Sequence, residues 1–317
     1  TSTTVAIALA LAFSFSSCTK NFEDFTTDNT AITPEDLKPN SEDLKLYFST
    51  AQMALQNFSE ANANSYQLQQ NLNADIYGGY MMTANPFNSG QNNSNYALIS
   101  SWNTEPFKVL YLKVLSPIHT LELAKTQETY PALWGSVLAV KVLATSRVTD
   151  IYGPIPYSIV GKNTDTNIPY DSQEAVYTQL FAELDQAHQL LQDYVSGKSV
   201  TEMPANLNEI DLIYSGGDNQ ARFTKWLKFV NSLRLRLAMR LVKVNPTLAK
   251  QQAEKALQAN QGGLLEDNQD NFKVRVNVES GFLNPLEFIA NNWSDININA
   301  SLEAYLSGYN DPRIGKY

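Results

Sequence analysis

A long polar stretch from Gly78 to Asn103, GGYMMTANPFNSGQNNSNYALISSWN, holds the side chains best suited to ligand chemistry. Its aromatic residues, Tyr80, Phe87, Tyr96 and Trp102, are interspersed with amides. A sugar ring presents an apolar C–H face and a rim of hydroxyl groups, and aromatic faces beside amide donors and acceptors match both. Long ordered loops inside compact domains are usually functional. The stretch therefore predicts a loop that binds a sugar.

Signals for metal binding and catalysis are weaker. Asp295, Asn297 and Asn299 have the spacing that opens a calcium loop, but Ala300 and Leu306 stand where glycine and glutamate are required. The two histidines lie far apart in the chain without a serine or cysteine nucleophile motif, so we expect them to be structural or to face solvent. We expect no metal, no cofactor and no catalytic residue. A carboxylate pair for glycoside hydrolysis stays open on sequence alone.

The first 40 residues have the features of an export signal followed by a tether. The apolar run Val5 to Phe15 is too short to span a bilayer but has the length of a signal-peptide core. It ends in FSSC, which is similar to the lipobox of bacterial lipoproteins, and Cys18 is the only cysteine. Lipidation explains a single cysteine in an exported protein better than packing does. We expect an incomplete signal peptide over residues 1–17 and a lipidated, flexible tether over 18–40.

The composition is that of a folded domain with an acidic balance. Of the 317 residues, 43% are hydrophobic and 17% are charged, which is typical of a globular chain. Lys and Arg number 23 against 32 Asp and Glu, so the formal net charge is −9. One predicted helix carries a basic stripe, but in an acidic chain such a stripe is usually a solvated or internally paired face. We therefore expect no binding to nucleic acid.

The rest of the chain shows mainly helical periodicity, and the helices that it predicts must position the loop. Apolar residues recur at intervals of three and four in segments 41–58, 65–81, 105–127, 131–148, 172–194, 223–244 and 245–263. Segment 131–148 is apolar nearly all round and should be buried, and Trp134 and Trp226 fall within helical periods and should lie in the core. Arg234 falls on a mostly apolar face, so we expect it to be buried and paired. Only residues 272–278 alternate as a strand would.

The segment KFVNSLRLRLAMRL, residues 228–241, resembles the Arg-rich helix of the SusD/RagB-like outer-membrane nutrient-binding lipoproteins of Bacteroidetes. Residues 149–157, TDIYGPIPY, are similar to a family turn, although the prolines alone favour a rigid exit from the preceding helix. Residues 310–317 resemble the family's Asp-Pro-Arg turn, which usually lies well before the natural end, so we expect a carboxy-terminal truncation. The resemblance implies a mainly α domain over residues 41–317. Its expected architecture is tetratricopeptide-like helical pairs wrapped by long loops, with at most a small β hairpin.

The resemblance also implies which residues contact a ligand. Family glycan-binding residues come from the region equivalent to the Gly78–Asn103 loop and from a later segment that here contains Asn292 and Trp293. This adds Trp102 and Trp293 as stacking candidates, and Asn92, Asn103 and Asn292 as hydrogen-bonding candidates, beside the loop tyrosines Tyr80 and Tyr96. Either tryptophan could instead anchor its loop in the core.

The implied protein is a binder and not an enzyme. It is anchored by lipid to the outer membrane, faces the cell exterior and delivers an oligosaccharide to a SusC-like TonB-dependent transporter, on which it acts as a hinged lid. RagB-like members of the family take peptides, so a peptide ligand is the main alternative. A surface glycoside hydrolase is the other.

Overall fold

The computed structural model describes residues 41–56, 63–85, 87–162, 167–274 and 283–316. The chain divides after Lys38, and all described residues belong to the second unit, Pro39–Tyr317. The predicted signal peptide, the tether and Cys18 lie outside the described residues. The fold is therefore that of the second unit.

This unit is built almost entirely from helices, which confirms the predicted mainly α fold. The long helices are α3 (Ser41–Gln56), α9 (Pro131–Tyr152), α10 (Gln173–Val195), α12 (Asn219–Arg240) and α13 (Pro246–Leu257). Shorter ones are α4 (Ala63–Tyr66), α5 (Ser100–Asn103), α6 (Glu105–Val109), α7 (Ser116–Leu123), α8 (Thr126–Thr129), α11 (Leu207–Ile210), α14 (Pro285–Asn291) and α15 (Ala300–Gly308). Short 3₁₀ turns cover Asn88–Gly90, Asn93–Asn95, Ala259–Gln261 and Pro312–Lys316.

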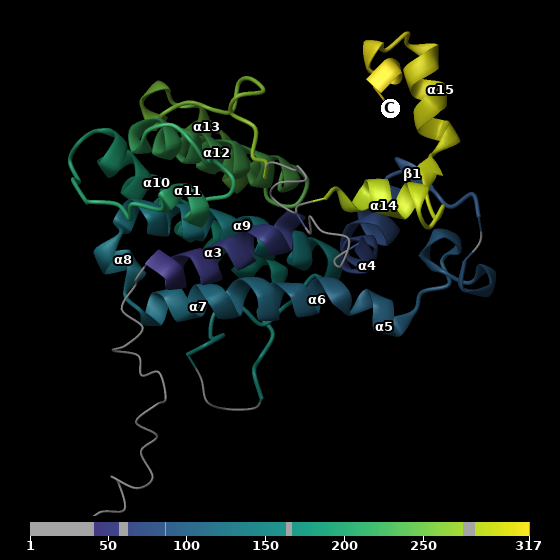
Figure 1. Cartoon of the computed structure of the whole chain (residues 1–317), viewed down its shortest axis with the longest axis horizontal. Helices are drawn as coiled ribbons and strands as arrows, with labels where there is room; N and C mark the ends of the chain where they lie inside the picture. Colours follow the sequence, from purple (N-terminus) through teal and green to yellow (C-terminus); the bar gives the residue numbers. More distant parts are fainter. Residues whose placement is uncertain (1–40, 57–62, 86, 163–166, 275–282, 317) are drawn as a thin grey trace, which may run out of the picture. The chain divides into compact units, whose positions relative to one another are not determined.

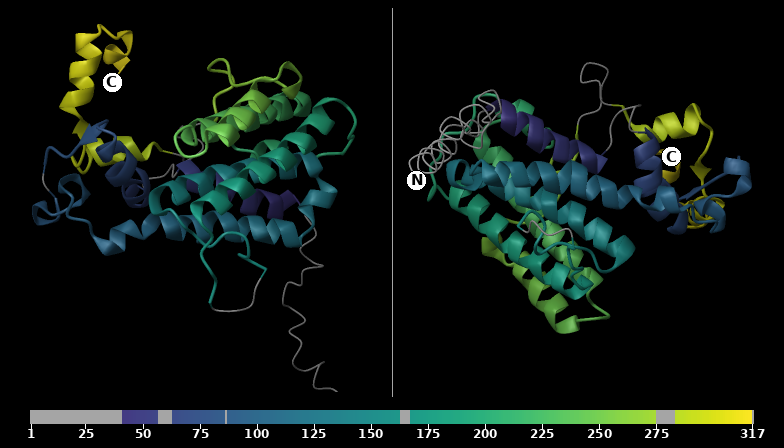
Figure 2. Two further views of the ribbon diagram at one scale, coloured as in Figure 1. Left: turned by 180° about the vertical axis from the view of Figure 1, so that it is seen from behind. Right: turned by 90° about the horizontal axis from the view of Figure 1, so that it is seen from below.

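Helix α9 is central because it is apolar nearly all round, as predicted. Pro131 occupies its first turn, where a missing N–H leaves no unpaired donor, and the helix continues to Tyr152, four residues beyond the predicted end. It packs most extensively against α10, which in turn packs against α12, and α12 pairs with α13. Figure 1 shows α10, α12 and α13 on one side of α9, with α3, α6 and α7 on the other; Figure 2 gives two further views.

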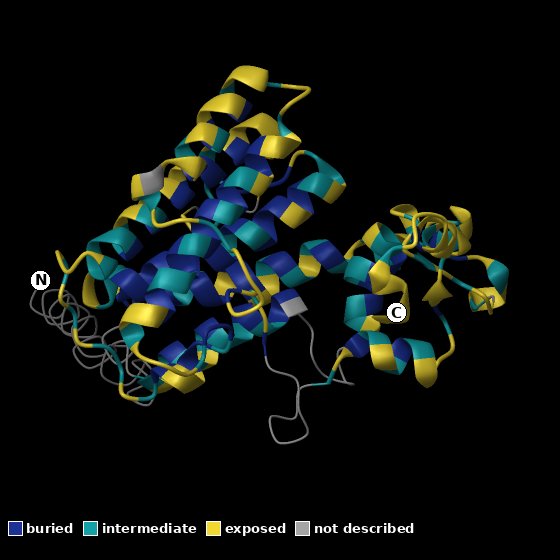
Figure 3. Ribbon diagram, turned by 90° about the horizontal axis from the view of Figure 1, so that it is seen from above, coloured by how far each residue is buried: buried dark blue, intermediate teal, exposed yellow. Residues whose placement is uncertain are grey.

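The core of this stack is organised around Trp226 of α12. The ring is fully buried and lies 5.2 Å from Tyr214 and 5.7 Å from Phe229, both in edge-on geometry. Trp134 of α9 is also buried, so both tryptophans predicted for the core are there. Arg234 is buried too, and its guanidinium contacts Asp185 at 2.5 Å, as expected of a paired arginine. Figure 3 shows the buried residues gathered where the helices face one another.

Two of the predicted helices contain π-helical segments, which sequence periodicity did not predict. Helix α4 continues into η2 (Gln67–Asp75), and α6 continues into η5 (Leu110–Leu115) before α7. Predicted helices 65–81 and 105–127 are therefore each a composite of α and π geometry. Single π turns recur at functional sites because the wider turn displaces side chains from their ordinary helical positions.

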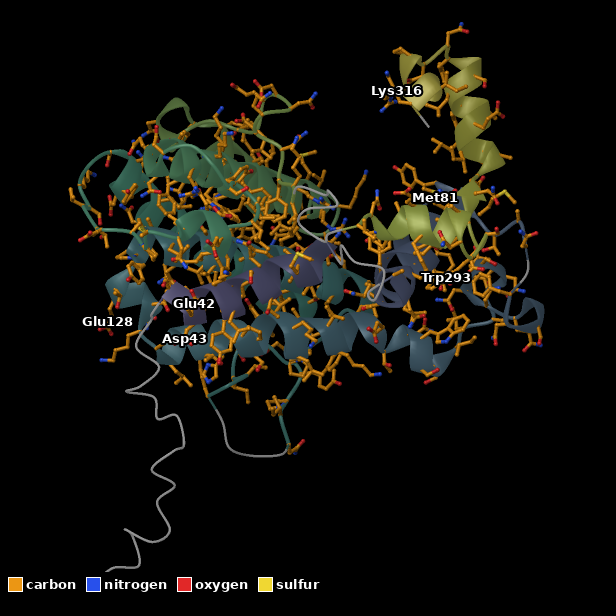
Figure 4. All side chains as sticks on the ribbon, in the orientation of Figure 1. Glu42, Asp43, Met81, Glu128, Trp293 and Lys316 are labelled. Carbon is orange, nitrogen blue, oxygen red and sulfur yellow. The ribbon has the colours of Figure 1, made fainter. Side chains whose placement is uncertain are left out.

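The small sheet differs from the predicted hairpin. Strand β1 (Met81–Met82) pairs antiparallel with β2 (Asn297–Ile298), which lies far away in the sequence. Residues 272–274 of the predicted strand are not in a strand, and residues 275–278 lie outside the described residues. A small apolar cluster of Ala63, Ile289 and Ile296 supports the same contact. Together they bring the segment after α14 against the beginning of the Gly78–Asn103 loop (Figure 4, Met81 and Trp293).

Residues 149–152 of the predicted turn are the last residues of α9, and residues 153–157 form the exit from this helix. Tyr157 is buried, and its hydroxyl donates to Glu183 of α10. The backbone N–H groups of Tyr157 and Ser158 both donate to Asp171 Oδ2, at 2.8 and 2.7 Å. These contacts tie the exit of α9 to the start of α10.

None of the described helices combines the length and the apolar character that crossing a membrane requires.

Candidate ligand-binding cavity

A cavity of about 780 Å³ opens where the ends of several helices meet the Gly78–Asn103 loop. Its volume lies in the range of pockets that enclose small ligands. Leu55 of α3, Leu110 and Val114 of η5, and Val148 and Ile151 of α9 contribute apolar surface. Polar groups enter from η2, from the loop and from α12. The cavity therefore combines an apolar wall with a limited set of polar groups.

The π-helical segments form part of this wall. Gln69, Gln70 and Asn73 of η2 line the cavity, and each donates its amide N–H to the protein itself. Gln69 donates to Ser65 at 3.0 Å, and Asn73 donates to the carbonyl of Leu68 at 2.6 Å. These bonds fix the orientation of the amides and leave their oxygen atoms as acceptors.

Two tyrosines stack on each other at the edge of the cavity. The rings of Tyr77 and Tyr96 are 5.5 Å apart and inclined by 19°, and both line the cavity. Tyr96 is 78% exposed and Tyr77 is 44% exposed, although the Tyr77 hydroxyl is fixed by donation to the carbonyl of Asn93 at 3.1 Å. Burial, with a smaller contribution from Tyr96, raises the pKa of Tyr77. The pair is an oriented aromatic surface that is open to a ligand.

The short 3₁₀ turn Asn93–Asn95 holds Tyr96 in place. Asn92 caps this turn by accepting from the Ser94 N–H at 2.9 Å, and the Asn95 side chain accepts from the Asn92 N–H. Tyr96 then adopts a left-handed backbone conformation with φ of 61°, which is uncommon for a tyrosine. The asparagine-rich sequence thus serves first to shape the loop and to direct the ring.

The charged groups of the cavity come from α9 and α12. Arg240 forms an ion pair of 2.8 Å with Asp150, and Asp150 also accepts from the Tyr177 hydroxyl at 2.7 Å. Arg147 donates to the carbonyl of Leu55 at 3.1 Å. Its side chain lines the cavity and keeps solvent-accessible surface. Burial lowers the pKa of Arg147, the nearby Arg236 lowers it further, and Tyr66 and Asp75 oppose the shift.

Two of the seven predicted contact residues, Tyr96 and Asn103, line this cavity. Asn103 lies at the end of α5, where its amide oxygen accepts from Asn93 Nδ2 at 3.1 Å and its carbonyl accepts from the Tyr152 hydroxyl. Within the described part of the chain no acceptor is bonded to Asn103 Nδ2, so this group can donate to a ligand.

Three other predicted residues of the loop lie outside the cavity wall. Asn92 is only 2% exposed, and both ends of its amide are used by the loop, since Nδ2 donates to the carbonyl of Phe87 at 3.2 Å. Trp102 is half-buried and its ring lies 6.1 Å from that of Phe87. Tyr80 is exposed next to the β1–β2 pair, where its carbonyl accepts from the Asn299 N–H at 3.0 Å.

The remaining two predicted residues, Asn292 and Trp293, follow α14. Trp293 is 38% exposed and packs edge-on against Phe288 at 5.2 Å. Neither residue lines the cavity, although the segment is tied to the loop by the bond from Asn85 Nδ2 to the carbonyl of Ser294 at 3.2 Å. The structure thus brings the two predicted segments into contact and places only the loop against the cavity.

Comparison with known proteins gives the family. A family model described as "SusD-like: Susd and RagB outer membrane lipoprotein" matches residues 24–317. The chain belongs to the SusD-like family. A comparison with curated proteins gave no match.

Solved structures of SusD homologues agree with this assignment. A chitin-binding SusD homologue from Flavobacterium johnsoniae is 39% identical, with a TM-score of 0.74, over 86% of this chain and 53% of that one. A SusD homologue from Bacteroides vulgatus is 32% identical, with a TM-score of 0.74, over 86% of this chain and 52% of that one. A third, from Bacteroides uniformis, is 31% identical, with a TM-score of 0.71, over 87% and 54%. The chain spans about half the length of these relatives.

The cavity residues that sequence reasoning missed in this SusD-like chain include Tyr77, Arg147 and Arg236. Tyr77 fell inside a predicted helix and was not assigned to the loop, although it directly precedes the two glycines at which the loop begins. Arg236 belonged to the basic stripe that we interpreted as solvated or paired, and Arg147 belonged to a helix predicted to be buried. Only the packing of α9 against α12 reveals that the two arginines share one cavity.

The histidines have local partners. His119 Nδ1 lies 3.4 Å from Glu122, and the His188 ring contacts the carbonyl of Gln261 at 3.1 Å. Burial lowers the pKa of His188. Over the described ranges, no three His, Cys, Asp or Glu side chains come together as metal ligands would.

Proposed function

We propose that this SusD-like chain binds an oligosaccharide in the cavity beside Tyr77 and Tyr96. The stacked tyrosine pair carries the proposal, because it offers an oriented, exposed aromatic face next to amide groups and apolar surface. Aromatic faces suit the C–H face of a sugar, and fixed amides suit its hydroxyl groups. The chitin-binding homologue from Flavobacterium johnsoniae supports a carbohydrate ligand.

Of the predicted residues, we propose Tyr96 and Asn103 as direct contacts and add Tyr77. Trp102 and Asn92 support the loop and do not contact the ligand, since Trp102 packs on Phe87 and Asn92 caps the turn before Tyr96. A second group of exposed side chains lies near the β1–β2 contact, outside the cavity, and consists of Tyr80, Asn292 and Trp293. We propose that only an oligosaccharide that extends beyond the cavity contacts them.

The same cavity favours binding over catalysis. Among the described residues that line it, Asp150 is the one carboxylate, and it is already bonded to Arg240 and Tyr177. Glycoside hydrolysis uses two carboxyl groups, about 5 to 10 Å apart, on either side of the scissile bond. We therefore propose a binder and not a hydrolase. Release of reducing ends from a glycan panel by the purified protein would contradict this assignment.

The proposed cellular role follows from the family of outer-membrane lipoproteins to which the chain belongs. We propose that Cys18 carries the lipid, that the domain faces the cell exterior and that the ligand passes to a SusC-like TonB-dependent transporter. Gentle solubilisation of outer membranes with a tagged protein should recover this transporter. Recovery of the tagged protein alone, under conditions that preserve other outer-membrane complexes, would remove the lid model and leave a free-standing binder.

A glycan array and a peptide library, probed in parallel, test the nature of the ligand. We expect glycan binding that Tyr96→Ala weakens by about tenfold, because loss of one aromatic contact removes about 1 kcal/mol or more. Tyr309→Ala is the matched control, since Tyr309 is 80% exposed and stacks on Tyr305 at 6.2 Å, outside the cavity wall. Binding to peptides and to no glycan would instead support a RagB-like peptide binder.

A further inference from the structure

Two arginines of the cavity lack a carboxylate partner among the described residues. Arg236 of α12 has neither an ion pair nor a hydrogen-bond acceptor there, and Arg147 of α9 donates only to the neutral carbonyl of Leu55. After burial, Arg236 is the next largest cause that lowers the pKa of Arg147. Two cations are thus held near each other in one partly enclosed space.

Among the described residues, the other charged groups near the cavity do not pair with these cations. Asp150 is the one carboxylate of the described lining, and Arg240 already neutralises it at 2.8 Å. Asp75 acts on Arg147 from nearby without forming an ion pair with it. Burial raises the pKa of Asp75, and its carboxylate accepts from Gln70 at 2.9 Å. Tyr66, the remaining titratable neighbour, is neutral because burial raises its pKa to about 12.

Such an arrangement is unfavourable for an empty cavity and suits an anionic group. Like charges held close together repel each other, and each guanidinium keeps solvent-accessible donors that are not bonded to any described residue. Guanidinium groups bind planar carboxylates through paired N–H donors. The concentration of positive charge also contrasts with a chain whose formal net charge is −9, so it is a local feature of the cavity.

We propose that the ligand is an acidic carbohydrate whose carboxylate binds between Arg147 and Arg236 while a neighbouring sugar ring stacks on Tyr96. The inference rests on the proposed function and adds the chemical class of the sugar. In this arrangement the aromatic edge of the cavity contacts the apolar face of the sugar, and the two arginines bind its carboxylate.

The test is an array of glycans in matched acidic and neutral forms, read beside a peptide library. Suitable pairs are sialylated lactose with lactose, and galacturonate oligomers with their methyl esters, and neutral chitooligosaccharides are included. We expect binding to at least one acidic form with an affinity about tenfold or more above its neutral match. The preference should fall as salt is added, because the attraction between the charges is screened.

Arg236→Gln tests the assigned residue. Arg236 is exposed and has no internal partner among the described residues, so the variant should fold with an unchanged melting temperature. It should reduce the preference for the acid to about twofold or less, because the affinity for the acid should fall much more than the affinity for the neutral form. Lys243→Gln is the control, because it removes one positive charge just beyond α12 from a residue that does not line the cavity.

The outcomes separate this inference from the proposed function. Binding confined to neutral glycans, or an acid preference that survives Arg236→Gln, overturns the acidic-ligand inference and leaves a glycan binder. Binding of peptides alone, or of nothing on either panel, overturns both.

Discussion

The indole N–H of Trp226 donates a hydrogen bond of 2.7 Å to Asp211 Oδ2 inside the helical core. Asp211 is fully buried, and its other oxygen accepts from the backbone N–H groups of Ile213 and Tyr214 at 3.1 and 3.2 Å. A single carboxylate therefore connects α12 to the segment that follows α11. This contact and the apolar face of α12 together fix the position of the arginine-rich helix in the core.

Trp226→Phe should destabilise the fold while keeping most of the apolar volume. The substitution removes one donor from a buried carboxylate, which costs about 1 to 3 kcal/mol. We expect a loss of this size in the free energy of unfolding, measured by urea denaturation. Trp293→Phe is the matched control, because Trp293 is partly exposed, and it should change stability by less than about 0.5 kcal/mol. Equal losses in the two variants would contradict the role given to the Trp226–Asp211 contact.

The connection between α9 and α10 should make stability depend on pH. Burial acts to raise the pKa of Asp171, but hydrogen bonds from Ser158 and from the Tyr157 backbone outweigh it, so the pKa lies below the ordinary 3.8. A carboxyl group with a depressed folded pKa adds stability that is present above its unfolded pKa and lost as pH falls through the folded value. We expect wild-type stability to fall between about pH 5 and about pH 3, and less so in Asp171→Asn.

The measurement is urea unfolding of both proteins across this range. At neutral pH the variant should already be less stable by about 1 kcal/mol, because a neutral amide accepts more weakly than a carboxylate. Parallel pH profiles would show that Asp171 does not contribute to the acid sensitivity of the fold.

Most of the scaffold could be predicted from the sequence because it depends on local patterns. Helix α10 begins at Gln173 after the Ser172 cap and ends at Val195, close to the predicted 172–194. Its boundaries are encoded by a capping hydroxyl and an apolar stripe that lie within the helix itself. Helix α13 likewise begins after a capping side chain, that of Asn245, although it ends at Leu257, before the two glycines that we expected to close it.

The cavity could not be predicted from local patterns, because contacts between segments far apart in the sequence form it. The π geometry of η2 and η5 changes which side chains face inward, and no periodicity in the sequence marks it. Each strand of the β1–β2 pair has two residues, too few to give an alternation, so the contact that brings the two predicted segments together was not visible. Tyr96 was predicted from the composition of the loop and Asn103 from the family resemblance, whereas the predicted tryptophans pack beside Phe87 and Phe288.

Trp102→Ala distinguishes a stacking tryptophan from one that supports the loop. Because Trp102 packs near Phe87 and does not line the cavity, we expect a lower melting temperature and an affinity within about twofold of wild type. Affinity is measured with the best glycan from the array, and Tyr96→Ala in the same assay should show the reverse pattern. An affinity loss of about tenfold in Trp102→Ala, without a change in melting temperature, would place Trp102 in direct contact with the sugar.

Cys18→Ala tests the proposed attachment to the membrane. The sequence that follows Cys18 is polar, and acyl chains on this cysteine are the means by which we expect the domain to be held on a bilayer. The variant, produced with its complete export signal, should therefore appear in the periplasm or the medium and should not fractionate with outer membranes. Metabolic labelling with a palmitate analogue should tag the wild type alone. Adding Lys20→Cys to the Cys18→Ala variant gives the matched control, because a cysteine outside the lipobox should not restore labelling. Labelling of Cys18→Ala itself would show that the lipid is carried elsewhere and would remove Cys18 as the anchor.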